Sequence, residues 1–197
     1  MLQFIENLDI YFFRVINSGW SNSAFDSFFP FITELENWLL LYIFAFLWMI
    51  FKGGTRGRLA AAALILTVLV TDQVNNQWLK DIFDRIRPCR ALEDVNLLIS
   101  CGTGKAFPSG HAANNFAAAI VFSHFYRKYS LAFFTIAVVI SLSRIYCGVH
   151  YPFDTIGGAF VGIVLGSLIV LLFKYPEKKW LKQKETFSAA KNNKQPG

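Results

Sequence analysis

The sequence is a succession of long apolar stretches separated by short polar segments. Five stretches contain no Asp, Glu, Lys or Arg, and they cover residues 37–51, 59–71, 106–126, 129–143 and 155–173. A membrane-spanning helix needs about 20 mostly apolar residues, so the shorter stretches must continue into their flanking residues. We therefore expect five membrane-spanning helices, at about residues 37–51, 58–79, 109–126, 130–147 and 154–173.

The N-terminal residues follow a different pattern. Charged side chains alternate there with apolar residues at helical spacing, which are Leu2, Ile5, Leu8, Phe12, Val15 and Ile16. An amphipathic helix that lies in the membrane interface has this pattern. Residues 24–31 are apolar but few, so we expect at most a partial sixth span there. We expect no signal peptide, because Arg14 is the first basic residue and no small-residue cleavage site follows it.

The composition indicates an integral membrane protein. Hydrophobic residues make up 54% of the chain and charged residues 16%, against roughly a quarter charged in an ordinary soluble domain. This excludes a disordered chain, a disulfide-rich mini-protein and a coiled coil. We predict an all-α integral membrane fold, a bundle of five to six transmembrane helices with an N-terminal interfacial helix. Its expected parts are an amphipathic or partial membrane segment (1–35), the transmembrane domain (36–175) and a basic cytoplasmic tail (176–197).

Basic residues are distributed unequally between the two sides of the predicted bundle. Of the 19 Lys and Arg residues, 12 fall in the loops after residues 51 and 126 and in the tail, and 6 fall on the opposite side. Cytoplasmic loops carry the excess of Lys and Arg, so the loops at 80–108 and 147–153 should face outward. The net charge of +6 fits this distribution better than a nucleic-acid partner. Residues 182–197 are expected to be a disordered, solvated tail.

Three polar clusters lie at the outward ends of the predicted spans, and the first runs from Lys80 to Pro88. Lys80 and Arg87 are seven residues apart, which is about two turns on a helix. Pro88 disfavours helical backbone at Arg87 and should move that residue into the loop. Two cations in this arrangement could hold one polyanion. The alternative is a set of interfacial residues in two helical ion pairs, Asp81 with Arg85 and Lys80 with Asp84.

The second cluster is Phe107-Pro108-Ser109-Gly110-His111. Ser109 is in the position of a helix N-cap, and Gly110 allows close approach to the backbone N–H groups that follow. Such a helix N-terminus favours an anion, and His111 in the first turn could exchange a proton near neutral pH. The alternative is a capped helix with an incidental histidine.

The third cluster joins Ser143-Arg144 to His150 and Asp154. Arg144 lies near the end of an apolar span, where a charge is costly unless it has a partner or a function. A carboxylate close to an imidazole fixes its tautomer and raises its basicity. The alternative is a histidine in the interface and an aspartate that caps the last span.

Together the three clusters resemble the signature of the type 2 phosphatidic acid phosphatase superfamily. This family includes membrane lipid phosphatases, soluble acid phosphatases and vanadium haloperoxidases. Its signature is Lys, six residues, Arg-Pro, followed by Pro-Ser-Gly-His, and then Ser-Arg, five residues, His, three residues, Asp. Every position is present between residues 80 and 154, in this order and at this spacing.

The resemblance implies a role for each signature residue. His150 would be the nucleophile that forms a phosphohistidine, Asp154 would orient it, and His111 would protonate the leaving oxygen and then activate water. The remaining residues would bind the phosphoryl oxygens; they are Lys80, Arg87, Ser109, Gly110 and Arg144. The resemblance implies no metal ion and no other cofactor.

The expected substrate is a lipid phosphate, because the site should lie at the membrane surface with no soluble domain above it. The loop from Pro88 to Pro108 is also short for a large recognition cap. Polyprenyl diphosphate is favoured, because small relatives often act on it. Phosphatidylglycerol phosphate, phosphatidate and lipid A phosphates remain alternatives. We expect an extracytoplasmic active site in a bacterial inner or plasma membrane. The oligomeric state stays open.

Other classes of function predict other patterns. A metal-dependent phosphatase would need clustered ligands, and the outward carboxylates are mixed with basic residues; they are Asp81, Asp84, Glu93 and Asp94. A transporter would have charges near the middle of its spans. An inactive scaffold would usually have a broken signature.

Cysteines and glycines give three further expectations. Cys89 and Cys101 lie in the outward loop, where an oxidising compartment would allow a disulfide, with two unpaired thiols as the alternative. Cys147 is expected to be a packing residue. Gly158, Gly162 and Gly166 recur at four-residue spacing on the last span, and Gly157 lies next to the first of them. Small residues at this spacing predict close helix packing within the monomer.

Overall fold

The computed structural model describes residues 2–192, and the side chains in this range apart from those of residues 2, 76, 181–185 and 187–192. All regular structure in the described range is helical. The elements are α1 (Leu2–Asn17), α2 (Ser23–Thr33), η1 (Leu35–Trp38), α3 (Leu39–Phe51), α4 (Gly54–Asp72), η2 (Gln73–Leu79), α5 (Lys80–Phe83), α6 (Pro88–Ala91), α7 (Gly110–Phe125), η3 (Arg127–Tyr129), α8 (Ser130–Tyr146) and α9 (Pro152–Asn192). The all-α fold class is confirmed.

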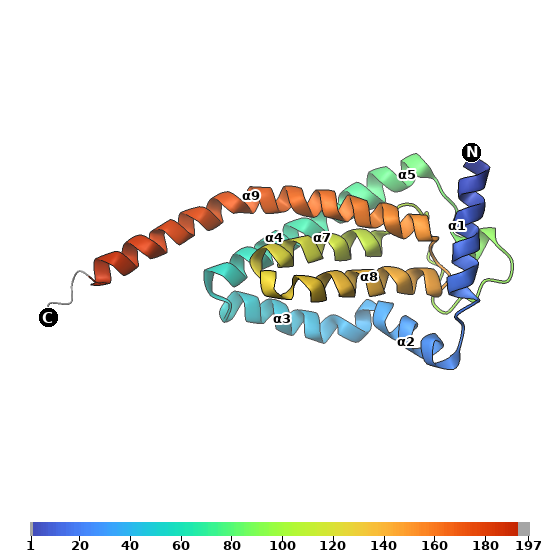
Figure 1. The fold of residues 1–197 in the computed structure, drawn as a ribbon, viewed down its shortest axis with the longest axis horizontal. Coiled ribbons are helices and arrows are strands. Elements are labelled where there is room, and N and C mark those ends of the chain that lie inside the picture. Colours follow the sequence, from blue (N-terminus) through green and yellow to red (C-terminus); the bar gives the residue numbers. More distant parts are fainter. Residues whose placement is uncertain (1, 193–197) are drawn as a thin grey trace.

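The long helices run side by side along the length of the molecule, with α7 in the middle (Figure 1). Helix α7 packs against α4, α8 and α9. Four of its alanines are buried in these contacts: Ala112, Ala113, Ala117 and Ala119. Helix α1 stands across one end of the bundle, next to the end of α8 and the start of α9 (Figure 1). The segments that carry the signature residues begin or end there.

Helices long and apolar enough to cross a membrane are fewer in the structure than in the prediction. Within the described residues the candidate ranges are Gly54–Ala91, Arg127–Tyr146 and Pro152–Trp180, and the continuous helix in the first range ends at Phe83. The helices Ser23–Thr33 and Leu35–Phe51 meet at a bend of 70°, and they make a fourth crossing if the pair is counted as one broken span. The predicted number of five to six spans is therefore not confirmed. The difference arises mainly at the centre, where α7 has 16 residues, below the length a full crossing needs.

Helix α1 has the length and the amphipathic character predicted for residues 2–16. Three residues of the predicted stripe, Ile5, Phe12 and Val15, are exposed, whereas Ile16 packs against the bundle. The opposite face packs on the bundle through Phe13 and two buried polar residues, Asp9 and Asn17. A helix that presents apolar side chains away from its own protein suits the membrane interface.

Close approach between α7 and α9 depends on the glycines of α9. A Cβ at Gly158, Gly162 or Gly166 would run into the backbone of α7. Gly158 meets Ser109, the residue before α7, Gly162 meets Ala113, and Gly166 meets Ala117. The prediction of glycine-mediated packing within the monomer is confirmed.

The predicted disorder from residue 182 is wrong as far as Asn192, because α9 continues to that residue. Lys, Gln, Glu and Ala are good helix formers, so this polar segment can extend a helix that membrane packing has already nucleated. Residues 193–197 of the predicted tail lie outside the described residues. Beyond the bundle α9 extends as a long projection (Figure 1).

Candidate active site

Lys80 and Arg87 belong to different local structures. The helix that begins as α4 loosens into π-helix over Gln73–Leu79 and ends at Phe83, so Lys80 lies directly after the π-helical turn. Arg87 has extended backbone (φ −69°, ψ 148°) and Pro88 begins α6. The prediction that Pro88 removes Arg87 from the helix is therefore confirmed. A shared helical face for the two cations is not what the structure shows.

The helical ion pairs considered for this segment do not form, because the helix ends too early for them. Asp84 pairs with Lys105 instead. Arg85, which no part of the signature includes, pairs with Asp154 of α9 and with Asp9 of α1.

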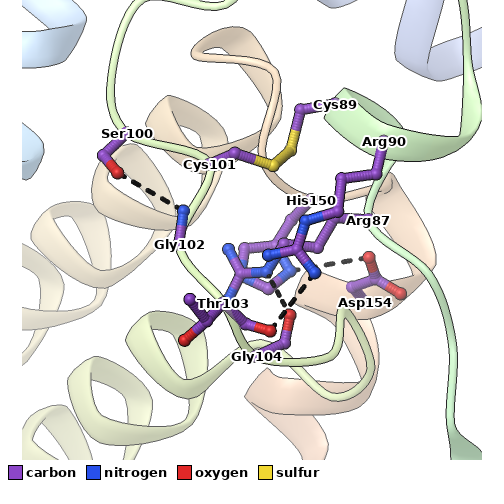
Figure 2. Close-up of a disulfide and its surroundings, with 10 residues drawn as sticks. All are labelled: Arg87, Cys89, Arg90, Ser100, Cys101, Gly102, Thr103, Gly104, His150 and Asp154. Carbon is purple, nitrogen blue, oxygen red and sulfur yellow. Dashed lines mark hydrogen bonds and ion pairs between the residues drawn. A yellow bond between two sulfur atoms is a disulfide. The ribbon is translucent and has the colours of Figure 1, made fainter.

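Arg87 is held by the loop that precedes α7. Its Nε donates to the carbonyl oxygen of Gly104 at 2.9 Å. The disulfide between Cys89 and Cys101 ties the start of α6 to the same loop, and Arg90 donates to the carbonyl oxygen of Thr103 (Figure 2). The structure thus contains the disulfide considered from the sequence, and that disulfide limits how far Arg87 can move.

Ser109 is the N-cap of α7, as predicted, but its hydroxyl does not cap the helix. Its Oγ is buried and has no hydrogen-bond partner among the described residues. Two other hydrogen bonds hold the turn: the backbone N–H of Ser109 donates to the carbonyl oxygen of Asp154, and the side-chain amide of Asn75 donates to the carbonyl oxygen of Pro108. The hydroxyl of Ser109 and the N–H of Gly110, the first residue of α7, can therefore serve a bound anion.

Arg144 lies in the last turn of α8 and is 8% exposed. Its Nη1 donates to the hydroxyl of Thr33 on α2 at 3.1 Å. Its Nε is buried without a hydrogen-bond partner among the described residues. A buried guanidinium with spare donors is costly unless an anion completes its contacts.

His150 and Asp154 form the centre of the cluster. The Nδ1 of His150 lies 3.5 Å from Oδ2 of Asp154, and both side chains are buried. The same carboxylate accepts the N–H of Tyr151 at 2.8 Å, so its position is fixed. Burial lowers the pKa of His150 to about 4, although Asp154 acts in the opposite direction. The imidazole is therefore neutral at physiological pH.

His111 lies in the first turn of α7, within reach of the other charged groups. The groups that interact electrostatically with it are Arg144, His150, Arg87 and Lys80. The structure thus brings all three clusters to one end of the bundle. This end of the bundle contains a neutral imidazole beside a carboxylate, a second imidazole, three cations and a helix N-terminus with a free hydroxyl. Groups of these kinds can support phosphoryl transfer.

Three residues at the site were missed by the sequence analysis: Asp9, Arg85 and Thr33. The sequence did contain a signal for Asp9. This residue lies four positions after Ile5 and three before Phe12, so its charge falls within the apolar stripe of the predicted helix. Arg85 stood in the first cluster but was assigned to a helical pair. No signal marked Thr33.

The residues described by the structure contain no group of three or more His, Cys, Asp or Glu side chains that could hold a metal ion. Of the outward carboxylates considered as ligands, Asp84 is engaged with Lys105.

Comparison with known proteins identifies relatives along most of the chain. The model of the PAP2 superfamily matches residues 58–178. The lipid A 4'-phosphatase of Porphyromonas gingivalis is 28% identical over 91% of this chain and 79% of that protein. The undecaprenyl-diphosphatase BcrC of Bacillus subtilis is 29% identical over 75% of this chain and 74% of that protein. The crystal structure of Aquifex aeolicus LpxE superposes with a TM-score of 0.66 and 32% identity, covering 83% of this chain and 94% of that one.

Proposed function

The chain belongs to the PAP2 superfamily, and on that premise we propose that it removes a phosphate group from a membrane lipid in two steps through His150. Membership makes it a membrane lipid phosphatase that acts without a metal ion. The observation that carries the proposed mechanism is the buried pair of His150 and Asp154, next to Arg87, Arg144 and His111.

In the first step the Nε2 of His150 attacks phosphorus. Its Nδ1 faces Asp154, so Nε2 on the other side of the ring keeps the lone pair that attacks. The N–P bond forms as the bond from phosphorus to the lipid oxygen breaks. Asp154 stabilises the positive charge that then develops on the ring.

His111 transfers protons in both steps. The negative charge of the bound phosphate favours the protonated form of His111, so that His111 enters the first step as an imidazolium. It donates its proton to the lipid oxygen as that oxygen leaves, which avoids a free alkoxide. In the second step it accepts a proton from the water that attacks phosphorus. The N–P bond breaks, inorganic phosphate is released and His150 returns to its neutral form.

The phosphoryl oxygens are bound by Lys80, Arg87 and Arg144 together with the hydroxyl of Ser109 and the N–H of Gly110. Phosphoryl transfer requires mainly positioning and stabilisation of charge. Three cations and a helix N-terminus supply the positive potential that a metal ion supplies in other phosphatases.

The substrate we favour is a phosphate monoester on a glycolipid of the lipid A type. A relative with this activity, the lipid A 4'-phosphatase of Porphyromonas gingivalis, matches 91% of the chain. The surface beside Lys80 and Arg87 also suits a lipid, because Ile82, Phe83 and Ile86 are all more than half exposed there. In the bilayer these side chains would face acyl chains and guide a lipid toward the site.

Polyprenyl diphosphate, favoured by the sequence analysis, is the second candidate. The observation in its favour is the similarity to an undecaprenyl-diphosphatase over three quarters of the chain. The same cations could bind the additional phosphate group.

The site faces the extracytoplasmic side in this proposal. The opposite end of the bundle carries Arg127, Lys174 and the basic C-terminal segment, and such residues mark the cytoplasmic side. A C-terminal epitope should therefore become accessible to antibody only after the membrane is permeabilised. Accessibility in intact cells would contradict this orientation.

The experiment that tests the function is phosphate release by the detergent-purified protein with a chelator present. The panel comprises lipid A, undecaprenyl diphosphate, phosphatidylglycerol phosphate and phosphatidate. We expect release from at least one lipid, acid-labile labelling of the protein by substrate phosphate, and loss of both in His150→Ala. The matched control is His124→Ala, because His124 pairs with Glu177 away from the site. Release that persists in His150→Ala, or that the chelator abolishes, would contradict the mechanism.

A further inference from the structure

Asp9 is a buried carboxylate in a helix that faces the membrane interface. Its side chain is 0% exposed. Oδ1 accepts the backbone N–H of Phe153 at 2.8 Å, and Oδ2 lies 2.7 Å from Nη2 of Arg85. Both partners adjoin Asp154, because Phe153 precedes it in the chain and Arg85 pairs with its carboxylate. A buried charge in this position is costly and persists only with such partners.

Arg85 connects this carboxylate to the proposed active site. Its Nη1 lies 2.8 Å from Oδ1 of Asp154, and its guanidinium stacks over the ring of Tyr151 at 4.1 Å. The planar guanidinium thus uses its two terminal nitrogens for two different carboxylates, Asp9 and Asp154. The second oxygen of Asp154 is the one that faces His150. A continuous chain of contacts runs from α1 through Arg85 and Asp154 to His150.

The position of Arg85 decides how strongly Asp154 can support His150. An arginine that bonded Asp154 alone would draw charge from that carboxylate and weaken its interaction with the imidazole. Asp9 shares the guanidinium and so reduces this pull. It also fixes the direction from which the rigid fork of Arg85 approaches Asp154.

We propose that Asp9 and Arg85 are positioning residues for the reaction. Helix α1, which carries Asp9, then helps to set the geometry of the catalytic centre. The proposal rests on the proposed function, because it assumes that His150 and Asp154 carry out the chemistry. Asp9 lies outside the residues 58–178 that the family model covers, and neither it nor Arg85 belongs to the signature.

The test compares Asp9→Asn with the unchanged protein. The amide oxygen can still accept the N–H of Phe153, while the charge that faces Arg85 is lost. We expect kcat to fall about 10- to 100-fold, with KM within about threefold, because the change displaces a reacting group without altering phosphate binding. Asp9→Glu, which restores the charge, should recover part of the loss. Glu6→Gln is the matched control, because it removes an exposed carboxylate from the same helix and should leave kcat unchanged.

A second readout does not depend on turnover. The chain has only three histidines, so the side-chain ¹⁵N NMR signals of a histidine-labelled sample can be assigned by substituting each in turn. Asp9→Asn should shift the ring signals of His150 and leave those of His124 in place. If Asp9→Asn does not fold, Arg85→Lys replaces it in this measurement. Lysine keeps the positive charge but cannot bond both carboxylates through a planar guanidinium, so the ring signals of His150 should again shift.

The outcomes separate the two proposals. An unchanged kcat in Asp9→Asn, or unshifted His150 signals in whichever of the two variants folds, overturns the positioning role and leaves the phosphatase function intact. An unmodified protein that releases no phosphate from any lipid contradicts the proposed function. The NMR shifts would still decide in that case whether α1 controls His150.

Discussion

The backbone N–H of Ser109 donates a hydrogen bond to the carbonyl oxygen of Asp154, with 2.9 Å between nitrogen and oxygen. This bond joins the start of α7 to the start of α9. The helix N-terminus proposed to bind phosphate is thereby attached directly to the residue proposed to orient the nucleophile. This backbone contact therefore helps to fix the position of the phosphorus atom relative to His150.

Replacement of His111 by Asn should affect substrates according to their leaving groups. A lipid alcohol needs a proton as it leaves, so hydrolysis of a lipid phosphate should fall about 10²- to 10⁴-fold. A nitrophenolate leaves without a proton, so the phosphorylation step with p-nitrophenyl phosphate should be far less impaired, and phosphoenzyme should accumulate. Rapid-quench labelling measures both steps.

The control for this variant is His124→Asn, which should behave as the unchanged protein with both substrates. Equal losses for the two leaving groups would contradict the role of His111 as a proton donor.

The stability of the protein should decrease as the pH falls from about 6.5 toward 4. Burial lowers the pKa of His150 to about 4 in the folded state, whereas an unfolded histidine titrates near 6.5. Between these values the unfolded chain binds the additional proton, so acid favours unfolding. The stabilisation is complete above pH 6.5. The measurement is the apparent unfolding temperature against pH, and His150→Gln should show a shallower slope. Parallel curves would contradict a buried neutral imidazole.

Removal of the disulfide by Cys89→Ser and Cys101→Ser should weaken phosphate binding and lower stability. The bridge closes a loop with a sequence separation of 12 residues, and a loop of this size contributes about 3 kcal/mol in the chain-entropy model. Arg87 depends on the same loop through Gly104, so KM should rise more than kcat falls. Reductant should impose the same changes on the unmodified protein and have no effect on the double variant. Thiols that are free in non-reducing mass spectrometry would contradict the bridge.

Substitution of Gly162 by Val should destabilise the bundle. A Cβ there would run into the backbone of Ala113, and overpacking of this kind costs about 1–3 kcal/mol. The apparent unfolding temperature in detergent should fall accordingly. Ile163→Val is the matched control, because the neighbouring side chain is partly exposed and its change should have little effect. A Gly162 variant as stable as that control would show that α7 and α9 are not in close contact.

Local signals in the sequence predicted much of the arrangement. Pro88 acts on the backbone of its neighbour, so the extended conformation of Arg87 could be read from the dipeptide. The N-cap position of Ser109 and the glycine spacing of α9 are also local patterns. Each depends on residues a few positions apart, and this is why sequence reasoning was able to find them.

The missed features depend on long-range contacts or on competition between conformations. Asp9 and Arg85 meet only after α1 has folded across the bundle, and nothing in the sequence pairs them. The π-helix before Lys80 is a local departure from α-helix, and the spacing of apolar residues does not distinguish the two. The extension of α9 to Asn192 reflects helix propensity that a reading based on charge alone had discounted.

The contact between α7 and α9 has a consequence for how the protein responds to its surroundings. Bilayers differ in thickness, and spanning helices commonly adjust by tilting or sliding past one another. Backbones that meet through Gly158, Gly162 and Gly166 leave little freedom for such movement. Ser109, His111 and Asp154 are built on these two helices. Changes in membrane thickness should therefore alter the depth at which a lipid headgroup reaches the site and leave the distances between the reacting atoms unchanged.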